Sequence, residues 1–213
     1  MVAVGTMKRK RWVWIGGWGL PPAWLREKLE ARLPEWDHFV IPPVRNWEAL
    51  FRAANADRCG GYSLGARLLL HQSDAVTAAN GASIPVLLAP FLPPEADSGE
   101  RGRRHETGFR KIQDLLSPNP AKALALFCKV AGLHGAASAH PPYPLEELAW
   151  GLRFLQQPPS PVEIPPHWSV WLGENDPLID TPAFTARHPS VNTVPGAGHD
   201  AGTLLDAFVT AAC

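Results

Sequence analysis

Cysteine is scarce in this 213-residue sequence, and the cysteines do not form a recognisable pair. The three are Cys59, Cys128 and Cys213, with no C-x-x-C spacing among them. An odd and sparse set argues against both a disulfide framework and a zinc site. We therefore expect a reducing compartment and no bound metal.

Net charge and long apolar runs are also lacking. Twenty basic and twenty acidic residues give a formal net charge of zero, so no global field attracts nucleic acid or a membrane surface. The basic residues 8–11 precede only a short apolar run that ends at Gly16 and Gly17. No stretch approaches the roughly 20 apolar residues of a membrane span. These features predict a soluble cytoplasmic protein with no nucleic-acid or membrane partner.

Strand and helix patterns alternate along most of the chain, whose hydrophobic content of 46% suits one globular domain with a single core. Buried strands are expected at 12–16, 36–41, 84–89, 168–172 and 191–194, with another just before Ser63. Helical patterns lie at 24–33, around Trp47, at 64–72 and from Thr203 onward. This alternation predicts an α/β protein with a doubly wound, mostly parallel sheet.

The alternation of strand and helix patterns stops in the middle of the chain. Proline and charge become dense, and three helical patterns at 107–116, 121–133 and 145–155 replace the strands. We therefore expect a core made of residues 1–91 and 167–213, with a small helical cap inserted at 92–166.

A G-x-S-x-G motif is present at Gly61, Ser63 and Gly65, between a short apolar run and an apolar helical pattern. This is the strand-turn-helix setting of a nucleophile elbow, so Ser63 is the candidate nucleophile. A strained turn leaves no room for Cβ atoms two residues to either side, which explains the glycines. The alternative is a glycine-rich turn with a solvated serine, because the pentapeptide alone recurs in unrelated sequences.

An acid and a histidine follow the last two expected strands. Asp176 follows Gly173 closely, and His199 lies in the glycine-containing loop 195–200. In a parallel sheet the loops at the carboxyl edge converge, and the order Ser63, Asp176, His199 is the nucleophile-acid-base order of α/β-hydrolases. Asp180 and Asp200 compete as the acid, but Asp180 is placed to cap the next helix and Asp200 is adjacent to the histidine.

From about Trp12 to Phe208 the chain resembles the α/β-hydrolase family. Within it the chain is similar to the pimeloyl-acyl-carrier-protein methyl ester carboxylesterases of biotin synthesis. The residues that carry this resemblance are Trp18-Gly19-Leu20, Gly61-Tyr62-Ser63-Leu64-Gly65 and an apolar cap with Phe109, Leu115 and Phe127. The run Gly-Tyr-Ser-Leu-Gly-Ala-Arg also resembles the menaquinone-pathway lyase, which usually has Gly where Ala66 stands.

The resemblance implies a Ser63-His199-Asp176 triad with no cofactor, and an oxyanion hole formed by the backbone N–H groups of Trp18 and Leu64. It also implies substrate contacts from Trp18 and Phe109. Two departures are visible. Gly16-Gly17 replaces the usual His-Gly before the oxyanion loop, which bears on the stiffness of that loop, and the usual N-terminal hairpin is missing, which shortens the sheet.

A basic cluster in the cap is the expected contact for a carrier-bound substrate. It consists of Arg101, Arg103, Arg104, Arg110 and Lys111. Such a cluster can steer an acidic acyl carrier protein, or it can be a solvated face diluted by Glu100 and Glu106.

The sequence thus predicts a carboxylic ester hydrolase, acting on the methyl ester of pimeloyl-acyl-carrier protein. The alternatives are a general carboxylesterase or thioesterase for small acyl esters, a lyase of the menaquinone-pathway type, and a catalytically silent binding protein.

Overall fold

The computed structural model of the protein describes residues 9–80, 83–92, 100–157 and 163–212. For residues 79–80, 100–106 and 212 this description is limited to the backbone.

A single six-stranded sheet forms the centre of the molecule, with the strand order β2-β1-β3-β4-β5-β6 and every neighbouring pair parallel. The strands are β1 (Arg11–Ile15), β2 (Asp37–Ile41), β3 (Arg58–Tyr62), β4 (Val86–Leu88), β5 (Ser169–Gly173) and β6 (Asn192–Val194). This confirms the α/β class and the parallel sheet. β4 is shorter than the expected 84–89, because only its three central residues pair with β3 and β5.

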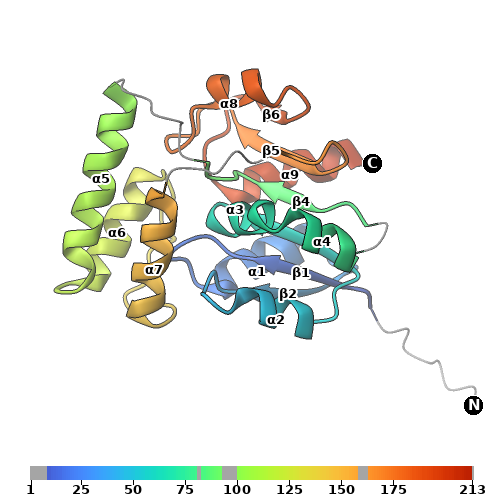
Figure 1. Ribbon diagram of the computed structural model, residues 1–213, viewed down its shortest axis with the longest axis horizontal. Coiled ribbons are helices and arrows are strands. Elements are labelled where there is room, and N and C mark those ends of the chain that lie inside the picture. Colours follow the sequence, from blue (N-terminus) through green and yellow to red (C-terminus); the bar gives the residue numbers. More distant parts are fainter. Residues whose placement is uncertain (1–8, 81–82, 93–99, 158–162, 213) are drawn as a thin grey trace, which may run out of the picture.

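The inner strands are apolar on both faces, as burial under helices requires. In β1 the run from Trp12 to Ile15 is fully buried, and in β4 all three residues are fully buried. Helices cover both faces: α1 and α9 pack together behind the sheet in Figure 1, while α2, α3 and α4 lie in front. The sheet is therefore doubly wound.

The helices of the core are α1 (Pro22–Arg32), α2 (Trp47–Ala53), α3 (Leu64–His71), α4 (Ser73–Asn80), α8 (Thr181–Arg187) and α9 (Ala201–Ala212). Helix α4 was not expected from the sequence. It is short, and Val76 is the only apolar residue in its sequence larger than alanine, so the sequence offers little apolar pattern from which to predict it.

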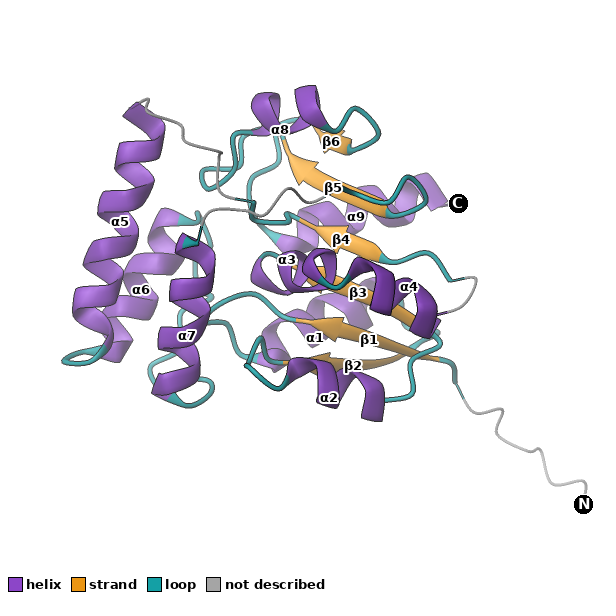
Figure 2. Ribbon diagram, viewed as in Figure 1, coloured by secondary structure: helices purple, strands orange, loops and turns teal. Residues whose placement is uncertain are grey.

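Three helices lie between β4 and β5, where the helical cap was expected: α5 (Glu100–Leu116), α6 (Pro120–Val130) and α7 (Leu145–Gln156). Helix α5 packs against both α6 and α7. The group, here called the cap, stands beyond one end of the sheet, and the arrowheads of the strands point toward it (Figure 2). The cap therefore faces the carboxyl ends of the strands.

Two further expectations concern the whole molecule. Within the described ranges, no helix is long and apolar enough to cross a membrane. Cys59 and Cys128 are buried in the core, and burial raises the pKa of Cys128 to about 11, so that thiol is protonated near neutral pH.

Candidate active site

Ser63 occupies a strained turn between β3 and α3. β3 ends at Tyr62, α3 begins at Leu64, and Ser63 between them has φ 53° and ψ −114°. A non-glycine residue rarely adopts this conformation, and such strain is concentrated at functional sites. The turn is anchored by the Ser63 N–H, which donates to the Leu88 carbonyl at 2.9 Å. The backbone geometry is that of a nucleophile elbow.

The two glycines of the motif are required by close backbone contacts. A Cβ on Gly61 would lie 2.7 Å from backbone atoms of Ala66, and a Cβ on Gly65 would collide with the carbonyl oxygens of Ile15 and Gly16. The Gly65 N–H also donates to the Gly16 carbonyl at 3.1 Å. The sequence argument from missing Cβ atoms is confirmed at both positions.

A continuous chain of hydrogen bonds joins the three residues expected to form the triad. His199 Nε2 lies 3.0 Å from Ser63 Oγ, and His199 Nδ1 lies 2.6 Å from Asp176 Oδ2. A carboxylate only accepts, so Nδ1 carries the ring proton and Nε2 is the acceptor for the serine hydroxyl. The side chains of His199 and Asp176 are fully buried. This is the arrangement that a general base needs.

Asp176 is held in place by its second oxygen. Its Oδ1 accepts from the Leu178 N–H at 2.8 Å, so both carboxylate oxygens are engaged. The two competing aspartates cap helices, which was expected for Asp180 only. Asp180 accepts from the Ala183 N–H at 3.2 Å, and Asp200 accepts from the Gly202 N–H at 2.8 Å.

Tyr62 links the elbow to the histidine loop, a role that the sequence did not reveal. Its hydroxyl donates to the backbone carbonyl of His199 at 2.8 Å, and its ring lies 5.4 Å from the imidazole. Complete burial raises the pKa of Tyr62 well above its usual range, so the hydroxyl remains a donor. A tyrosine immediately before the serine was visible in the motif, but its partner lies 137 positions away.

The expected oxyanion donors, the N–H groups of Trp18 and Leu64, belong to the two segments that meet at Gly65. Leu64 opens α3, where the first N–H groups of a helix have no intrahelical acceptor. In the part of the chain that the structure describes, no protein acceptor takes the N–H of Trp18 or of Leu64. Both groups therefore remain able to donate to a bound oxygen.

The side chain of Trp18 is fully buried against the cap. Its indole Nε1 donates to the Leu148 carbonyl of α7 at 2.8 Å, and its ring meets Phe127 of α6 edge to face at 4.8 Å. Phe109 of α5 is also buried and packs on Phe91, just after β4, at 5.6 Å. Trp18 and Phe109, the two expected substrate contacts, thus lie in the apolar packing where cap and core meet.

Arg67 ties the elbow helix to the end of α7. Its guanidinium is almost wholly buried and donates to the carbonyls of Leu155 and Gln157 at 3.0 and 2.9 Å. Burial lowers the pKa of Arg67 to about 10, which leaves it charged at neutral pH. This link could not be predicted from the sequence, because an arginine on a helix is ordinarily exposed.

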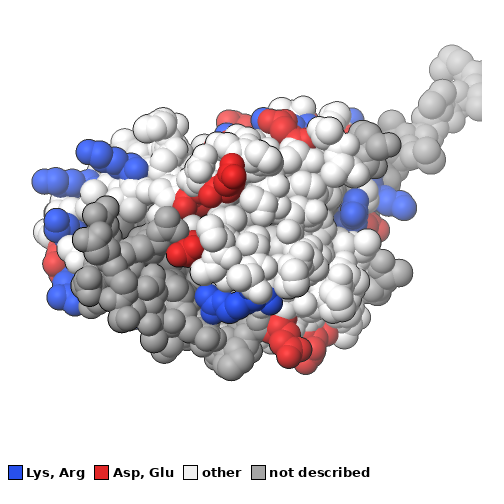
Figure 3. Space-filling view, turned by 90° about the horizontal axis from the view of Figure 1, so that it is seen from above, with Lys and Arg blue, Asp and Glu red and all other residues white. Residues whose placement is uncertain are grey.

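The basic cluster is described only in part. Arg101, Arg103 and Arg104 lie in α5, but their side chains are outside the described residues; Arg110 and Lys111 are exposed. In Figure 3 Lys and Arg atoms gather at the end of the molecule that carries the cap, while much of the remaining surface is uncharged. Arg110 and Lys111 are therefore two exposed basic residues of α5 in the cap.

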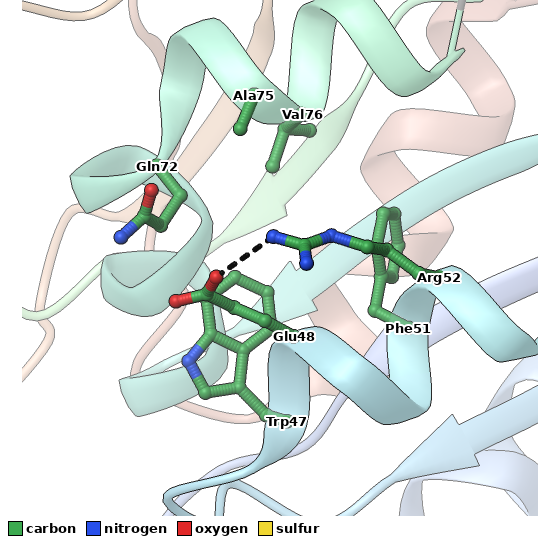
Figure 4. Close-up of a pocket in the computed structure, with 7 residues that line it drawn as sticks. All are labelled: Trp47, Glu48, Phe51, Arg52, Gln72, Ala75 and Val76. Carbon is green, nitrogen blue, oxygen red and sulfur yellow. Dashed lines mark hydrogen bonds and ion pairs between the residues drawn. The ribbon is translucent and has the colours of Figure 1, made fainter.

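Two surface hollows lie away from Ser63. One, of about 20 Å³, is enclosed by α2, α4 and the turn between α3 and α4, and the Glu48–Arg52 ion pair of 3.1 Å spans its rim (Figure 4). Such a volume holds about one water molecule and no acyl chain. The other, of about 280 Å³, lies between α5 and α7. No triad residue lines either hollow.

A parallel sheet with a serine elbow after β3, an acid after β5 and a histidine after β6 defines the α/β-hydrolase fold. The fold is similar to that of MenH from S. aureus, with a TM-score of 0.62 at 13% identity over 98% of this chain and 93% of that one. An esterase from a marine microorganism gives 0.58 at 12% identity over 97% and 95% of the two chains. BioG from Haemophilus influenzae gives 0.52 at 14% identity over 94% and 92%.

No family model matches the chain, and no curated protein matches it. At the identities of the solved structures the likeness shows the fold alone, so any activity has to be argued from the site itself.

Proposed function

We propose that this protein is a cytoplasmic serine hydrolase that cleaves a carboxylic ester through Ser63, His199 and Asp176. The observation that supports this most is the buried hydrogen-bond chain from Ser63 Oγ through both imidazole nitrogens to Asp176. A buried carboxylate is costly unless it is paired, and Asp176 is paired with His199, which it orients toward the strained Ser63. The strain, the burial and the pairing together favour catalysis over a structural role.

Acylation begins when Ser63 Oγ attacks the ester carbonyl and its proton passes to His199 Nε2. Asp176 stabilises the imidazolium that forms, and the carbonyl oxygen becomes an oxyanion that the N–H groups of Leu64 and Trp18 bind. Loss of one such donor costs on the order of 3 kcal/mol of transition-state stabilisation. His199 then gives its proton to the leaving alkoxide, and an alcohol departs.

Deacylation repeats these steps with water as the nucleophile. His199 removes a proton from the water as it attacks the acyl-enzyme, and returns a proton to Ser63 Oγ when the ester bond to the serine breaks. The products are the free acid and a regenerated enzyme.

The substrate that we propose is the methyl ester of pimeloyl-acyl-carrier protein. The sequence resemblance at residues 18–20 and 61–65 favours it, as do the apolar side chains that the cap and the core bring together. The basic end of the molecule, with Arg110 and Lys111, suits an acidic carrier. A pimeloyl group that is attached to the carrier at one end and methylated at the other would place its methyl ester at Ser63.

The nucleophile is tested with a fluorophosphonate probe. Wild-type protein should be labelled at Ser63, and Ser63→Ala should lose both labelling and ester hydrolysis while keeping its circular dichroism spectrum. His199→Ala should lose hydrolysis equally, and the double variant should be no worse, because triad members act as a unit. A folded wild-type protein that takes no label would favour a silent binding protein.

The substrate is tested by comparing rates on esters that differ in one part. Pimeloyl-acyl-carrier-protein methyl ester should be preferred over p-nitrophenyl esters of graded length and over the acyl-carrier thioester itself. Equal rates on all esters would leave a general carboxylesterase. Labelling of Ser63 without hydrolysis of any ester would instead favour a lyase on the same fold.

A further inference from the structure

The loop of residues 16–19, which carries the expected Trp18 donor, makes few backbone hydrogen bonds within the described part of the chain. The Gly16 N–H donates to the Ile41 carbonyl at 2.9 Å, and the Gly16 carbonyl accepts from Gly65. For residues 17–19, among the described part of the chain, the next backbone anchor is the Gly19 N–H, which donates to the Tyr143 hydroxyl at 2.7 Å. Gly16 and Gly17 supply no stiffness of their own, because glycine has the most backbone freedom.

Tyr143 comes from the cap and not from the sheet. It precedes α7, lies 124 positions from Gly19, and is strongly buried together with its partner. Burial raises the pKa of Tyr143 above its usual range, so the hydroxyl stays neutral and fixed as a polar partner. A buried N–H that loses its only acceptor must move or remain unpaired.

Helix α7 holds the same loop a second time, through Trp18. The indole N–H donates to the Leu148 carbonyl, and Gly151 one turn further lets the helix lie against the ring. A Cβ on Gly151 would approach Trp18 Cδ1 to 2.8 Å and Leu64 Cδ2 to 3.0 Å. Gly151 therefore faces both residues whose N–H groups are expected to bind the oxyanion.

We propose that Tyr143 and Gly151 are positioning residues that let the cap set the oxyanion hole, in place of stiffness within the Gly16-Gly17 loop. The Tyr143 hydroxyl fixes the loop just after Trp18, and the closely packed α7 fixes the Trp18 ring. The backbone N–H of Trp18 is therefore held in one direction. The proposal rests on the proposed ester hydrolysis. It makes the cap part of the catalytic apparatus.

The test is Tyr143→Phe, which removes the hydroxyl and keeps the ring. With p-nitrophenyl butyrate we expect kcat to fall about tenfold while KM stays within about twofold, because a small displacement of a donor weakens transition-state binding and not substrate binding. An aryl trifluoromethyl ketone, whose adduct with Ser63 carries an oxyanion, should lose affinity by a similar factor. The affinity of the product acid should not change.

Ile112→Val is the matched control, since it removes one methylene from the buried face of α5 without touching the loop. It should keep wild-type kcat and ketone affinity. Gly151→Ala is the second variant, and should lower kcat and ketone affinity in the same way whether or not Tyr143→Phe folds.

Wild-type kcat and ketone affinity in either folded variant would overturn the proposal, as would an equal loss in Ile112→Val. Failure of the proposed function has a different signature: the wild-type protein would then show no hydrolysis, or Ser63→Ala would retain it.

Discussion

Asp176→Asn should abolish nearly all hydrolysis by changing one atom in the buried hydrogen-bond chain. In the native site Asp176 accepts twice, from His199 Nδ1 at 2.6 Å and from the Leu178 N–H at 2.8 Å. The Leu178 N–H requires an acceptor, so the asparagine oxygen stays there and its NH₂ turns toward His199. Because an amide NH₂ donates, Nδ1 must become an acceptor and the ring proton moves to Nε2, facing Ser63.

A histidine protonated at Nε2 cannot take the serine proton. The same tautomer change in a serine protease lowers kcat by about 10⁴, and we expect a similar factor here. At about 1.4 kcal/mol per factor of ten, this corresponds to roughly 5.5 kcal/mol added to the barrier. The free energy of unfolding should change far less, since asparagine fills the same volume and still makes both hydrogen bonds.

The assay is kcat on p-nitrophenyl butyrate, with the fraction folded measured by circular dichroism and the stability by urea denaturation. Asp180→Asn and Asp200→Asn are the matched controls. Each of these aspartates caps a helix, and asparagine caps about as well as aspartate, so both controls should stay within about threefold of wild type.

Two results would refute this reasoning. A folded Asp176→Asn protein with kcat within tenfold of wild type would show that Asp176 does not set the tautomer. A larger loss in Asp200→Asn than in Asp176→Asn would move the acid to the neighbour of His199.

Three further predictions concern the elbow, its link to the cap and the carrier. Gly65→Ala should destabilise the protein by at least about 2 kcal/mol in urea denaturation, because the new Cβ meets backbone oxygens that cannot turn away. Gly108→Ala is the control and should be neutral or slightly stabilising, because a Cβ at Gly108 enters open space. Equal effects of the two substitutions on stability would contradict the packing argument. Arg67→Met should cost about 2 kcal/mol of unfolding free energy by leaving two carbonyls at the end of α7 without their donor, and unchanged stability would show that the link is dispensable. Replacing Arg110 and Lys111 with Glu should lower kcat/KM about tenfold for an acyl-carrier ester and less than twofold for p-nitrophenyl butyrate. The effect on the carrier substrate should weaken as salt rises, because exposed charges are screened beyond about 8 Å at physiological ionic strength. Equal losses on both substrates would indicate a damaged cap.

Local chemistry explains why so much of the site could be predicted. The elbow is specified by five consecutive residues around Ser63. Its glycines are required by close contacts within the same strand-turn-helix unit or with the end of the adjoining strand. The choice of Asp176 over Asp180 and Asp200 was also local: Asp180 is placed to cap the next helix within three residues, and Asp200 is adjacent to His199.

Long-range contacts were out of reach of the same reasoning. Nothing local pairs Tyr143 with Gly19, Tyr62 with the His199 carbonyl, or Arg67 with the end of α7, because each partner lies about 90 or more positions away and any buried acceptor would have served. Helix α4 was missed for a different reason, since it is short and Val76 is its only apolar residue larger than alanine.

The sequence by itself therefore determined the parallel sheet, the elbow and the residues that meet at its edge, since strand burial and turn chemistry are written in short stretches. Only the tertiary structure decided how the cap contacts the loop of residues 16–19. That contact depends on how closely α7 approaches Trp18, and the approach is a property of packed surfaces from distant parts of the chain.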